Sequence, residues 1–272
     1  MRCVRVLLVL VILTLIVTGC DSRTLPAGST SPDTVTLKLS RGDFPVLVYN
    51  PKGKLKGTVV FGSGDGGWKI WEERACRSLA LEGWCVIGWD CREYASDQFP
   101  AYDAVILGKD LQTMASAGIG SRTRGNFLLY RGYSTGAEQS VAGVAWILSQ
   151  RVVTETLPTG LLLVAPGQRG RYGITDSDLL GITPQGSGSF AIADLALNLG
   201  DLAVVQIHGT FDPLDSTEWL GSSSSHHGPH RVFEINGEGH FFGDADANLQ
   251  ETLCQAVNWL VSQPAPINPK TR

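Results

Sequence analysis

Apolar and polar residues alternate in two segments near the start of the chain, and the pattern then changes. Residues 34–39 and 44–49 alternate in this way, which predicts two strands. A polar turn at residues 51–57 separates them from an apolar run at residues 58–61. We expect these three strands to form an antiparallel meander.

Beyond residue 67, segments with helical spacing alternate with short apolar runs. Strands that alternate with helices indicate an α/β fold, a mostly parallel sheet with helices on both faces. In such sheets, ligands bind beyond the carboxyl ends of the strands. The expected helices are residues 68–81, 102–115, 137–148 and 245–261, and the expected strands are residues 84–89, 126–130, 161–164, 203–207 and 231–235.

One serine stands between a predicted strand and a predicted helix. Ser134 is the centre of the segment Gly-Tyr-Ser-Thr-Gly at residues 132–136, directly after an apolar run. Glycine is needed two places to each side because the turn is too tight for a Cβ there, and this arrangement is a nucleophile elbow. The turn would lift the Ser134 hydroxyl clear of the sheet and aim the Thr135 N–H at the same point.

A nucleophilic serine needs a base, and the base needs an acid that orients it. His240 follows a predicted strand and precedes the last helix, which no other histidine does; the alternative is a satisfied surface histidine. Asp212, just beyond another strand, is the expected acid, with Asp215 as the nearest substitute. The alternative for Asp212 is a turn residue before Pro213. The order Ser134, Asp212, His240 is the order found in α/β-hydrolases.

An oxyanion hole requires backbone N–H groups aimed at the oxygen on which charge develops. The Thr135 N–H would supply one of them. The second is expected from the loop after the third strand, residues 62–67, with Gly64 as the first choice and Asp65 or Ser63 as the substitute.

The same glycine loop fits two other kinds of site. Gly62, Gly64 and Gly67 have the spacing of a dinucleotide fingerprint, and Asp90 ends the next strand. Three observations weigh against a dinucleotide site: the export signal described below, the two strands that precede the motif, and the set of serine, aspartate and histidine. We therefore expect no cofactor. A phosphate loop fails because Trp68 stands where that motif needs lysine.

Two further groups of side chains each allow two interpretations. His226, His227 and His230 have the residue type of a metal site, but no acid or cysteine neighbours them, so we expect a solvated loop and no metal. Trp68 and Trp71 follow the glycine loop, and they either pack in the core or form a platform for the substrate.

The first 19 residues contain two arginines, no acid and an unbroken apolar stretch from residue 6 to residue 13. The stretch is shorter than the about 20 residues of a membrane-spanning helix, and it predicts a secretory signal. It ends in Val-Thr-Gly-Cys, which resembles the bacterial lipoprotein signal, with Cys20 lipidated after cleavage. A plain signal peptide with an incidental cysteine is the alternative. Asp21 resembles the inner-membrane retention signal of enterobacterial lipoproteins, so we expect a periplasmic protein anchored to a membrane.

The rest of the chain suits one domain. Residues 20–33 are rich in Ser, Thr, Pro and Gly, which predicts a flexible tether. We expect residues 34–263 to form the folded body and residues 264–272 to form a tail. Residues 169–200 show little regular pattern and occupy the position of a cap over the substrate pocket. The formal net charge is −4, and more negative without the leader, which argues against nucleic acid as a partner.

Besides Cys3 and Cys20 the chain has four cysteines, which outside the cytoplasm allow three pairings. The strand between Cys85 and Cys91 spans roughly 20 Å, so these two cannot be bridged. Cys76 and Cys254 fall on the first and last large helices, which we expect on one face of the sheet. The sequence allows two alternatives, a disulfide between Cys76 and Cys254 or buried free thiols. The four cysteines are Cys76, Cys85, Cys91 and Cys254.

These motifs resemble the VirJ domain of bacterial virulence proteins, which the AcvB proteins share, over residues 58–263. The resemblance rests on Gly-Ser-Gly-Asp-Gly-Gly-Trp at 62–68, Gly-Tyr-Ser-Thr-Gly-Ala at 132–137 and His240-Phe241. Asp-Cys-Arg-Glu-Tyr at 90–94 resembles the family's Asp-x-x-Arg-Tyr segment with altered spacing. The chain departs from the family at Thr135, where Phe is usual, and in having its own lipobox.

The resemblance implies a periplasmic α/β-hydrolase. For AcvB-type members it implies cleavage of the aminoacyl ester of lysyl-phosphatidylglycerol, and for VirJ it implies association with a type IV secretion system.

The sequence therefore predicts a membrane-tethered serine hydrolase that acts on an ester, with an aminoacylated or other phospholipid as a candidate substrate. Ser134 would be the nucleophile, His240 its base and Asp212 the orienting acid. The alternative is a noncatalytic periplasmic binding or assembly protein for a secretion machine. Loss of Ser134 or His240 would be its signature, and both residues are present.

Overall fold

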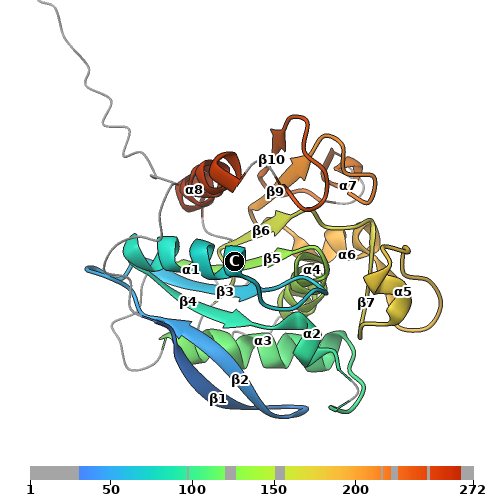
Figure 1. The fold of residues 1–272 in the computed structure, drawn as a ribbon, viewed down its shortest axis with the longest axis horizontal. Helices are drawn as coiled ribbons and strands as arrows, with labels where there is room; N and C mark the ends of the chain where they lie inside the picture. The colour runs from blue at the N-terminus through green and yellow to red at the C-terminus, as the bar shows by residue number, and fades with distance from the viewer. Residues whose placement is uncertain are drawn as a thin grey trace, which may run out of the picture.

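A sheet of eight strands runs through the centre of the molecule (Figure 1). The computed structural model describes residues 31–96, 98–119, 127–150, 157–215, 217–221, 226–243 and 246–264. The strand order is β1-β2-β4-β3-β5-β6-β9-β10, and the predicted α/β fold with a mostly parallel sheet is confirmed. The strands are β1 (Asp33–Leu39), β2 (Gly42–Tyr49), β3 (Gly57–Gly62), β4 (Trp84–Trp89), β5 (Phe127–Tyr133), β6 (Gly160–Val164), β9 (Val204–Gly209) and β10 (His230–Ile235).

One edge of the sheet differs from the predicted meander. β1 and β2 pair antiparallel as expected, but β2 then pairs antiparallel with β4 rather than with β3. β3 lies further inside, parallel to both β4 and β5. Every residue of β3 is buried, and such an unbroken apolar run is typical of a central parallel strand covered on both faces. The meander prediction is wrong because it assumed that strands consecutive in the chain pair with each other. The apolar and polar residues of β3 do not alternate, which instead indicates a central strand.

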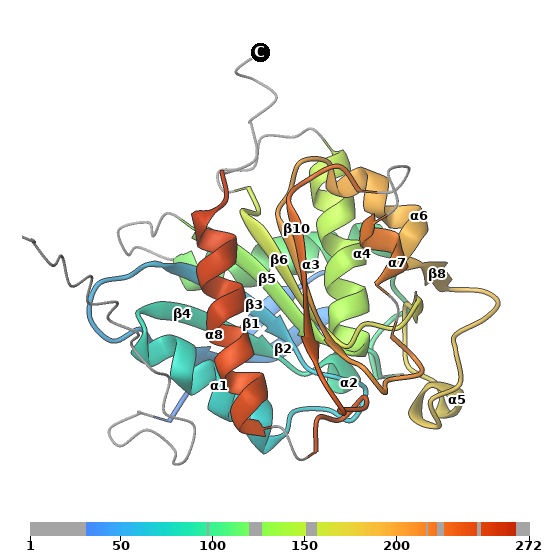
Figure 2. The same ribbon diagram turned by 90° about the horizontal axis from the view of Figure 1, so that it is seen from above.

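Helices cover both faces of the sheet, as predicted. α1 and α8 lie side by side over one face (Figure 2), where their apolar residues share a core with the sheet. α3 and α4 cover the other face, and they pack closely because Gly108 leaves room for the Trp146 ring. The larger helices are α1 (Ile70–Leu81), α3 (Ala104–Ile119), α4 (Thr135–Ser149) and α8 (Asp246–Ser262).

Residues 169–200, for which the sequence predicted little regular structure, contain a series of short elements. Two of them, β7 and β8, pair as an antiparallel ribbon. Each element has only three to five residues, which is too short for a period of 2 or 3.6 to show in the sequence. The short elements of this segment are β7 (Arg169–Arg171), α5 (Asp176–Leu179), β8 (Ser189–Ala191), α6 (Ile192–Ala196) and the 3₁₀ turn η1 (Leu197–Leu199). Two other short helices, α2 (Cys91–Tyr94) and α7 (Glu218–Gly221), lie elsewhere in the chain.

The predicted leader, Cys20, Asp21 and the last eight residues of the predicted tail lie outside the described residues. Among the helices that the structure describes, none combines the length and the apolar character needed to cross a bilayer.

Candidate active site

Ser134 stands in the turn between β5 and α4, as predicted. Its backbone has φ 50° and ψ −123°, a conformation that is strained for a residue with a side chain. The two flanking glycines are required by close packing. A Cβ on Gly132 would lie 2.1 Å from the Gly136 carbonyl oxygen, and a Cβ on Gly136 would lie 2.3 Å from the Ser63 carbonyl oxygen. The turn therefore holds the serine in the geometry of a nucleophile elbow.

The three residues chosen from the sequence as nucleophile, base and acid are in contact. His240 Nε2 lies 2.9 Å from Ser134 Oγ, and His240 Nδ1 lies 2.8 Å from Asp212 Oδ2. Asp212 follows β9 and His240 follows β10, and these neighbouring parallel strands end at the same edge of the sheet as β5. The arrangement can move a proton from the serine hydroxyl to the imidazole, with the carboxylate fixing the tautomer.

The environment of Asp212 favours its charged form. Burial opposes ionisation, but the hydrogen bond to His240 and the Leu214 N–H outweigh it, so the pKa of Asp212 lies below its usual value. The Leu214 N–H donates to Oδ1 at 2.9 Å while Oδ2 faces the imidazole. Asp212 is therefore set to remain a carboxylate and to stabilise an imidazolium beside it.

Asp215, the substitute considered from the sequence, has other partners. Its Oδ2 lies 2.9 Å from His208 Nδ1, and its Oδ1 accepts a hydrogen bond of 2.5 Å from Gln206 Nε2. The side-chain oxygen of Gln206, Oε1, in turn accepts a hydrogen bond from Trp219 Nε1 at 3.0 Å. The Asp215 side chain thus belongs to a separate network that holds the loop after β9, while the backbone of Asp215 helps to hold the Asp212 carboxylate.

The two residues proposed for the oxyanion hole both lie next to Ser134. Thr135 is the first residue of α4, so its N–H has no acceptor within the helix. Gly64 packs against the elbow, where a Cβ would lie 2.9 Å from the Tyr133 ring and 3.7 Å from Ser134 Cβ. Ser63, one of the two substitutes, uses its Oγ to accept the Cys91 N–H at 3.0 Å.

Tyr133 contributes to the site although no motif in the sequence points to it. Its hydroxyl donates a hydrogen bond of 3.0 Å to the His240 backbone carbonyl, and its ring packs against Trp71 with centroids 4.7 Å apart. The loop that carries the base is therefore tied to the residue before the nucleophile. No pattern in the sequence reports this contact, because the two residues are 107 positions apart.

A cavity of about 270 Å³ opens beside Ser134 and His240. Three carboxyl groups line it, those of Asp65, Glu138 and Asp178. Burial raises the pKa of Asp65, and it raises the pKa of Glu138 to about 8. Glu138, which the sequence analysis also missed, lies one turn along α4 from the nucleophile and accepts the Gly167 N–H at 2.9 Å.

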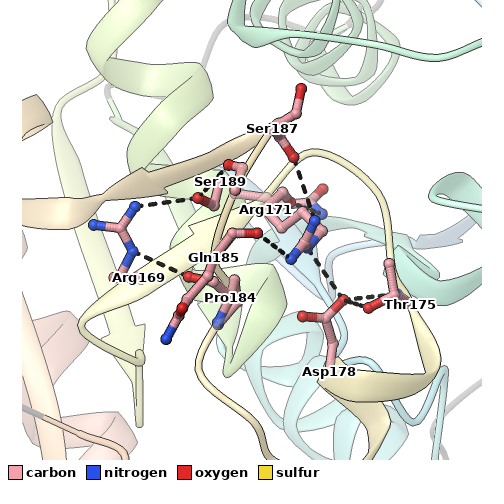
Figure 3. A network of polar contacts seen from close by, with 10 residues as sticks. Arg169, Arg171, Thr175, Asp178, Pro184, Gln185, Ser187 and Ser189 are labelled. Atoms are coloured by element: carbon pink, nitrogen blue, oxygen red, sulfur yellow. Dashed lines mark hydrogen bonds and ion pairs between the residues drawn. The ribbon is translucent and has the colours of Figure 1, made fainter.

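The segment from β7 to β8 forms one wall of this cavity and is held by two arginines (Figure 3). Arg169 donates to the Pro184 carbonyl at 3.0 Å and to Ser189 Oγ at 3.1 Å. Arg171 donates to the Gln185 carbonyl at 2.8 Å and forms an ion pair of 3.5 Å with Asp178. These contacts fix the turn that carries α5 against the β7–β8 ribbon. The segment expected to act as a cap therefore borders the cavity in an ordered form.

The residues behind the rejected dinucleotide interpretation have structural roles. The Asp90 carboxylate accepts the N–H groups of Arg92, Glu93 and Trp68, so it caps α2 and fastens the glycine loop. The Trp68 and Trp71 rings pack against Phe61, with centroids 5.5 and 6.0 Å away. Neither ring lines the cavity beside Ser134, so their packing fits the core interpretation.

The predicted solvated histidine loop is wrong for one of its members. His226 is 4% exposed, and its Nε2 lies 3.0 Å from the Leu202 carbonyl oxygen. The His226 ring lies edge-on to the Trp219 ring, and burial lowers the pKa of His226. His227 and His230 are exposed. Among the described residues, no group of His, Cys, Asp and Glu is placed to hold a metal ion.

The cysteines are thiols in the structure. Cys76, Cys85 and Cys91 are buried, and Cys254 Sγ lies 3.5 Å from Glu82 Oε1. Cys76 and Cys254 are on helices that share a sheet face, as expected, but they form no disulfide. The thiol alternative therefore fits the structure.

The sheet, the two helical layers and the serine at a strand–helix turn define the α/β-hydrolase fold. The chain belongs to the family of the bacterial virulence protein (VirJ), whose sequence model matches residues 57–259. The resemblance seen in the sequence is therefore confirmed, and so is the fold that it implied.

Solved structures with low sequence identity share this fold. The α/β hydrolase GrgF from Penicillium sp. sh18 is 13% identical, with 85% of this chain and 100% of that chain covered and a TM-score of 0.61. An α/β serine hydrolase without a lid from Xanthomonas campestris is 20% identical, with 86% and 98% covered and a TM-score of 0.54. The acylaminoacyl peptidase of Pyrococcus horikoshii is 10% identical, with 90% and 44% covered and a TM-score of 0.63. No protein with a curated description matches the chain significantly.

Proposed function

We propose that this protein is a serine hydrolase that cleaves an ester through an acyl-enzyme on Ser134. The observation that carries the proposal is the chain of hydrogen bonds from Asp212 through His240 to Ser134 Oγ. The similar structures include a serine hydrolase and a peptidase, which supports hydrolysis as the class of reaction.

In the first half of the reaction, Ser134 Oγ attacks the ester carbonyl carbon while its proton moves to His240 Nε2. The Thr135 and Gly64 N–H groups would stabilise the oxyanion that forms. The intermediate then collapses, and His240 gives the proton to the departing alkoxide, which leaves as an alcohol. In the second half, His240 takes a proton from water and the hydroxide attacks the acyl-serine. His240 then gives this proton to Ser134 Oγ as the acyl–oxygen bond breaks, so that the acid and the free Ser134 hydroxyl are released.

The acyl group is proposed to carry a positive charge, as in an aminoacylated phospholipid. Three carboxyl groups line the cavity next to Ser134. A substrate ammonium placed among them would favour their ionised forms, because an opposite charge nearby lowers the pKa of a carboxyl group. This is the type of ester that the resemblance to AcvB proteins implied. The proposed location is the periplasmic side of a membrane, with the chain anchored through lipidated Cys20.

The test is covalent labelling by a fluorophosphonate probe, which reacts with activated serines. The protein would be the mature chain, residues 20–272, with Cys20→Ser to keep it soluble. We expect rapid labelling that is lost in Ser134→Ala and His240→Ala. Ser149→Ala, at the far end of α4, and His227→Ala, on an exposed loop, are matched controls that should label normally.

Absence of labelling in a folded protein would refute the proposal. It would instead favour the noncatalytic binding or assembly protein considered from the sequence.

A further inference from the structure

The most exposed apolar side chains of the described part of the chain gather at one place. Phe241 is 83% exposed, Leu180 76% and Phe211 73%, and no other large apolar side chain there exceeds 60%. Leu179, the last residue of α5, and Ile182 are 41% and 54% exposed and lie within two residues of Leu180. We call these five residues, Leu179, Leu180, Ile182, Phe211 and Phe241, the apolar rim.

The apolar rim lies at the active-site cavity, and Leu180 stands between two residues that line it, Leu179 and Gly181. Leu179, Ile182 and Phe241 line that cavity together with Ser134. Phe211 lies on the other loop of the mouth, where its N–H donates to the Glu238 carbonyl at 2.8 Å. Phe241 follows the proposed base in the sequence, and Phe211 precedes the proposed acid. Each of the two aromatic residues is therefore adjacent in the chain to a proposed catalytic residue.

The backbone holds these side chains outward. Phe242, next to Phe241, has φ 48° and is 4% exposed, so the chain buries one ring and turns the other toward solvent. The contacts of Arg169 and Arg171 with Pro184, Gln185 and Asp178 hold both ends of the segment between residues 178 and 185 (Figure 3), and Leu180 lies in this segment. Exposed apolar side chains that lie together, in contrast to ones scattered singly, mark interaction sites.

The start of the folded body lies close enough for a lipid anchor to reach this face. Asp33, the first residue of β1, pairs with Val48 of β2, and Val48 pairs with Ile87 of β4. Ile87 is two residues before the end of β4, so β1 begins near the edge of the sheet where β4 ends. β1 and β5 are four positions apart in the sheet, which is about 19 Å at the usual strand spacing. The 13 residues from Cys20 to Asp33 can extend about 43 Å. An anchored chain can therefore bring the mouth of the cavity against the membrane.

We propose that the apolar rim docks on the surface of a lipid bilayer, so that Ser134 meets its ester at the membrane itself. The proposal rests on the proposed function for the lipid anchor and the ester substrate. Leucine, isoleucine and phenylalanine side chains partition into the boundary between headgroups and acyl chains. The rim would supply a second, direct contact with the membrane, next to the cavity.

The test uses the mature chain with Cys20→Ser and vesicles of phosphatidylethanolamine and phosphatidylglycerol. We expect this unlipidated protein to co-sediment with the vesicles. The double variant Leu180→Ser/Phe211→Ser should bind about 10- to 100-fold more weakly. The control is Val105→Ser/Leu197→Ser, which removes two exposed apolar side chains outside the rim and should bind as the parent does.

Labelling by the soluble fluorophosphonate probe separates this proposal from the proposed function. Leu180 and Phe211 do not line the cavity, so the rim variant should label at the parent rate. Absence of vesicle binding by the parent protein, or equal losses in the rim and control variants, would overturn the docking surface while leaving the hydrolase intact. A parent dimer that only the rim variant dissociates would also overturn it, because the rim would then be an interface between two copies.

Discussion

At the scale of single residues, the loop after β9 carries two aspartates with different partners. Asp212 faces His240, whereas Asp215 contacts His208 and Gln206. We expect Asp212→Asn to lower kcat/KM for an ester by about 10³- to 10⁴-fold, because an amide neither fixes the imidazole tautomer nor stabilises the imidazolium. Steady-state hydrolysis of a p-nitrophenyl ester would measure the loss.

Asp215→Asn is the matched variant for this prediction. It should lower the free energy of unfolding by about 1–3 kcal/mol, because it disturbs a buried hydrogen-bonded network. The folded fraction should retain most of its activity. The acid is wrongly assigned if Asp215→Asn abolishes hydrolysis in a folded protein and Asp212→Asn does not.

Glu138 makes stability depend on pH. Burial raises its pKa to about 8 in the folded protein, from the ordinary value of 4.5. Between these two values the unfolded chain holds fewer protons at this site, so the residue's contribution to stability falls as the pH rises toward 8. Glu138→Gln keeps an acceptor for the Gly167 N–H and removes the ionisation.

We expect Glu138→Gln to match the parent near pH 4 and to be more stable by roughly 2–4 kcal/mol at pH 9. Urea unfolding at the two pH values would measure the difference. An equal effect at both values would mean that ionisation of Glu138 is not its cause.

At the scale of elements, the segment from β7 to β8 is held by its own side chains. The hydrogen bonds of Arg169 and Arg171 in this network reach residues 14 to 20 positions along the chain. We expect Arg171→Ala to raise KM for long-chain esters by about 3- to 10-fold, because α5 would no longer be fixed against the cavity. Hydrolysis of acetate and decanoate esters would be compared.

The short ester is the internal control for this prediction, because it does not need the wall that α5 provides. Arg231→Ala, an exposed arginine on β10, should change neither value of KM. Equal losses for short and long esters would mean that Arg171 supports the whole domain and not the wall of the cavity.

The sequence predicts the elements that have a strong pattern and misses those that depend on distant contacts. β4 has the predicted bounds because its apolar run is unbroken, and the elbow is visible because glycine is required on both sides of Ser134. Asp212 and His240 could be placed because parallel strands bring their carboxyl ends to one edge. The sequence does not show which strands pair with each other, so the predicted position of β3 in the sheet was wrong. Tyr133 and Glu138 were missed because their roles come from tertiary packing.

At the scale of the whole molecule, the proposed anchor makes a separate prediction for the full-length chain in bacteria. Cys20→Ser removes the thiol that would be lipidated. We expect it to abolish labelling with radioactive palmitate and to release the protein from the membrane fraction, whereas Cys85→Ser, at a buried thiol, should change neither. Palmitate labelling and fractionation would be measured together. Retention of the label in Cys20→Ser would refute Cys20 as the lipidated residue.

The distances along the chain between the three proposed catalytic residues have a consequence for the timing of activity. Ser134 is 106 residues before His240, while Asp212 is only 28 residues before it. A ribosome therefore completes the elbow long before it makes the base, and β10 and α8 must still join the sheet. A truncated or half-made chain carries the serine without a partner to deprotonate it. The proposed esterase activity would thus begin only once the last part of the domain has folded.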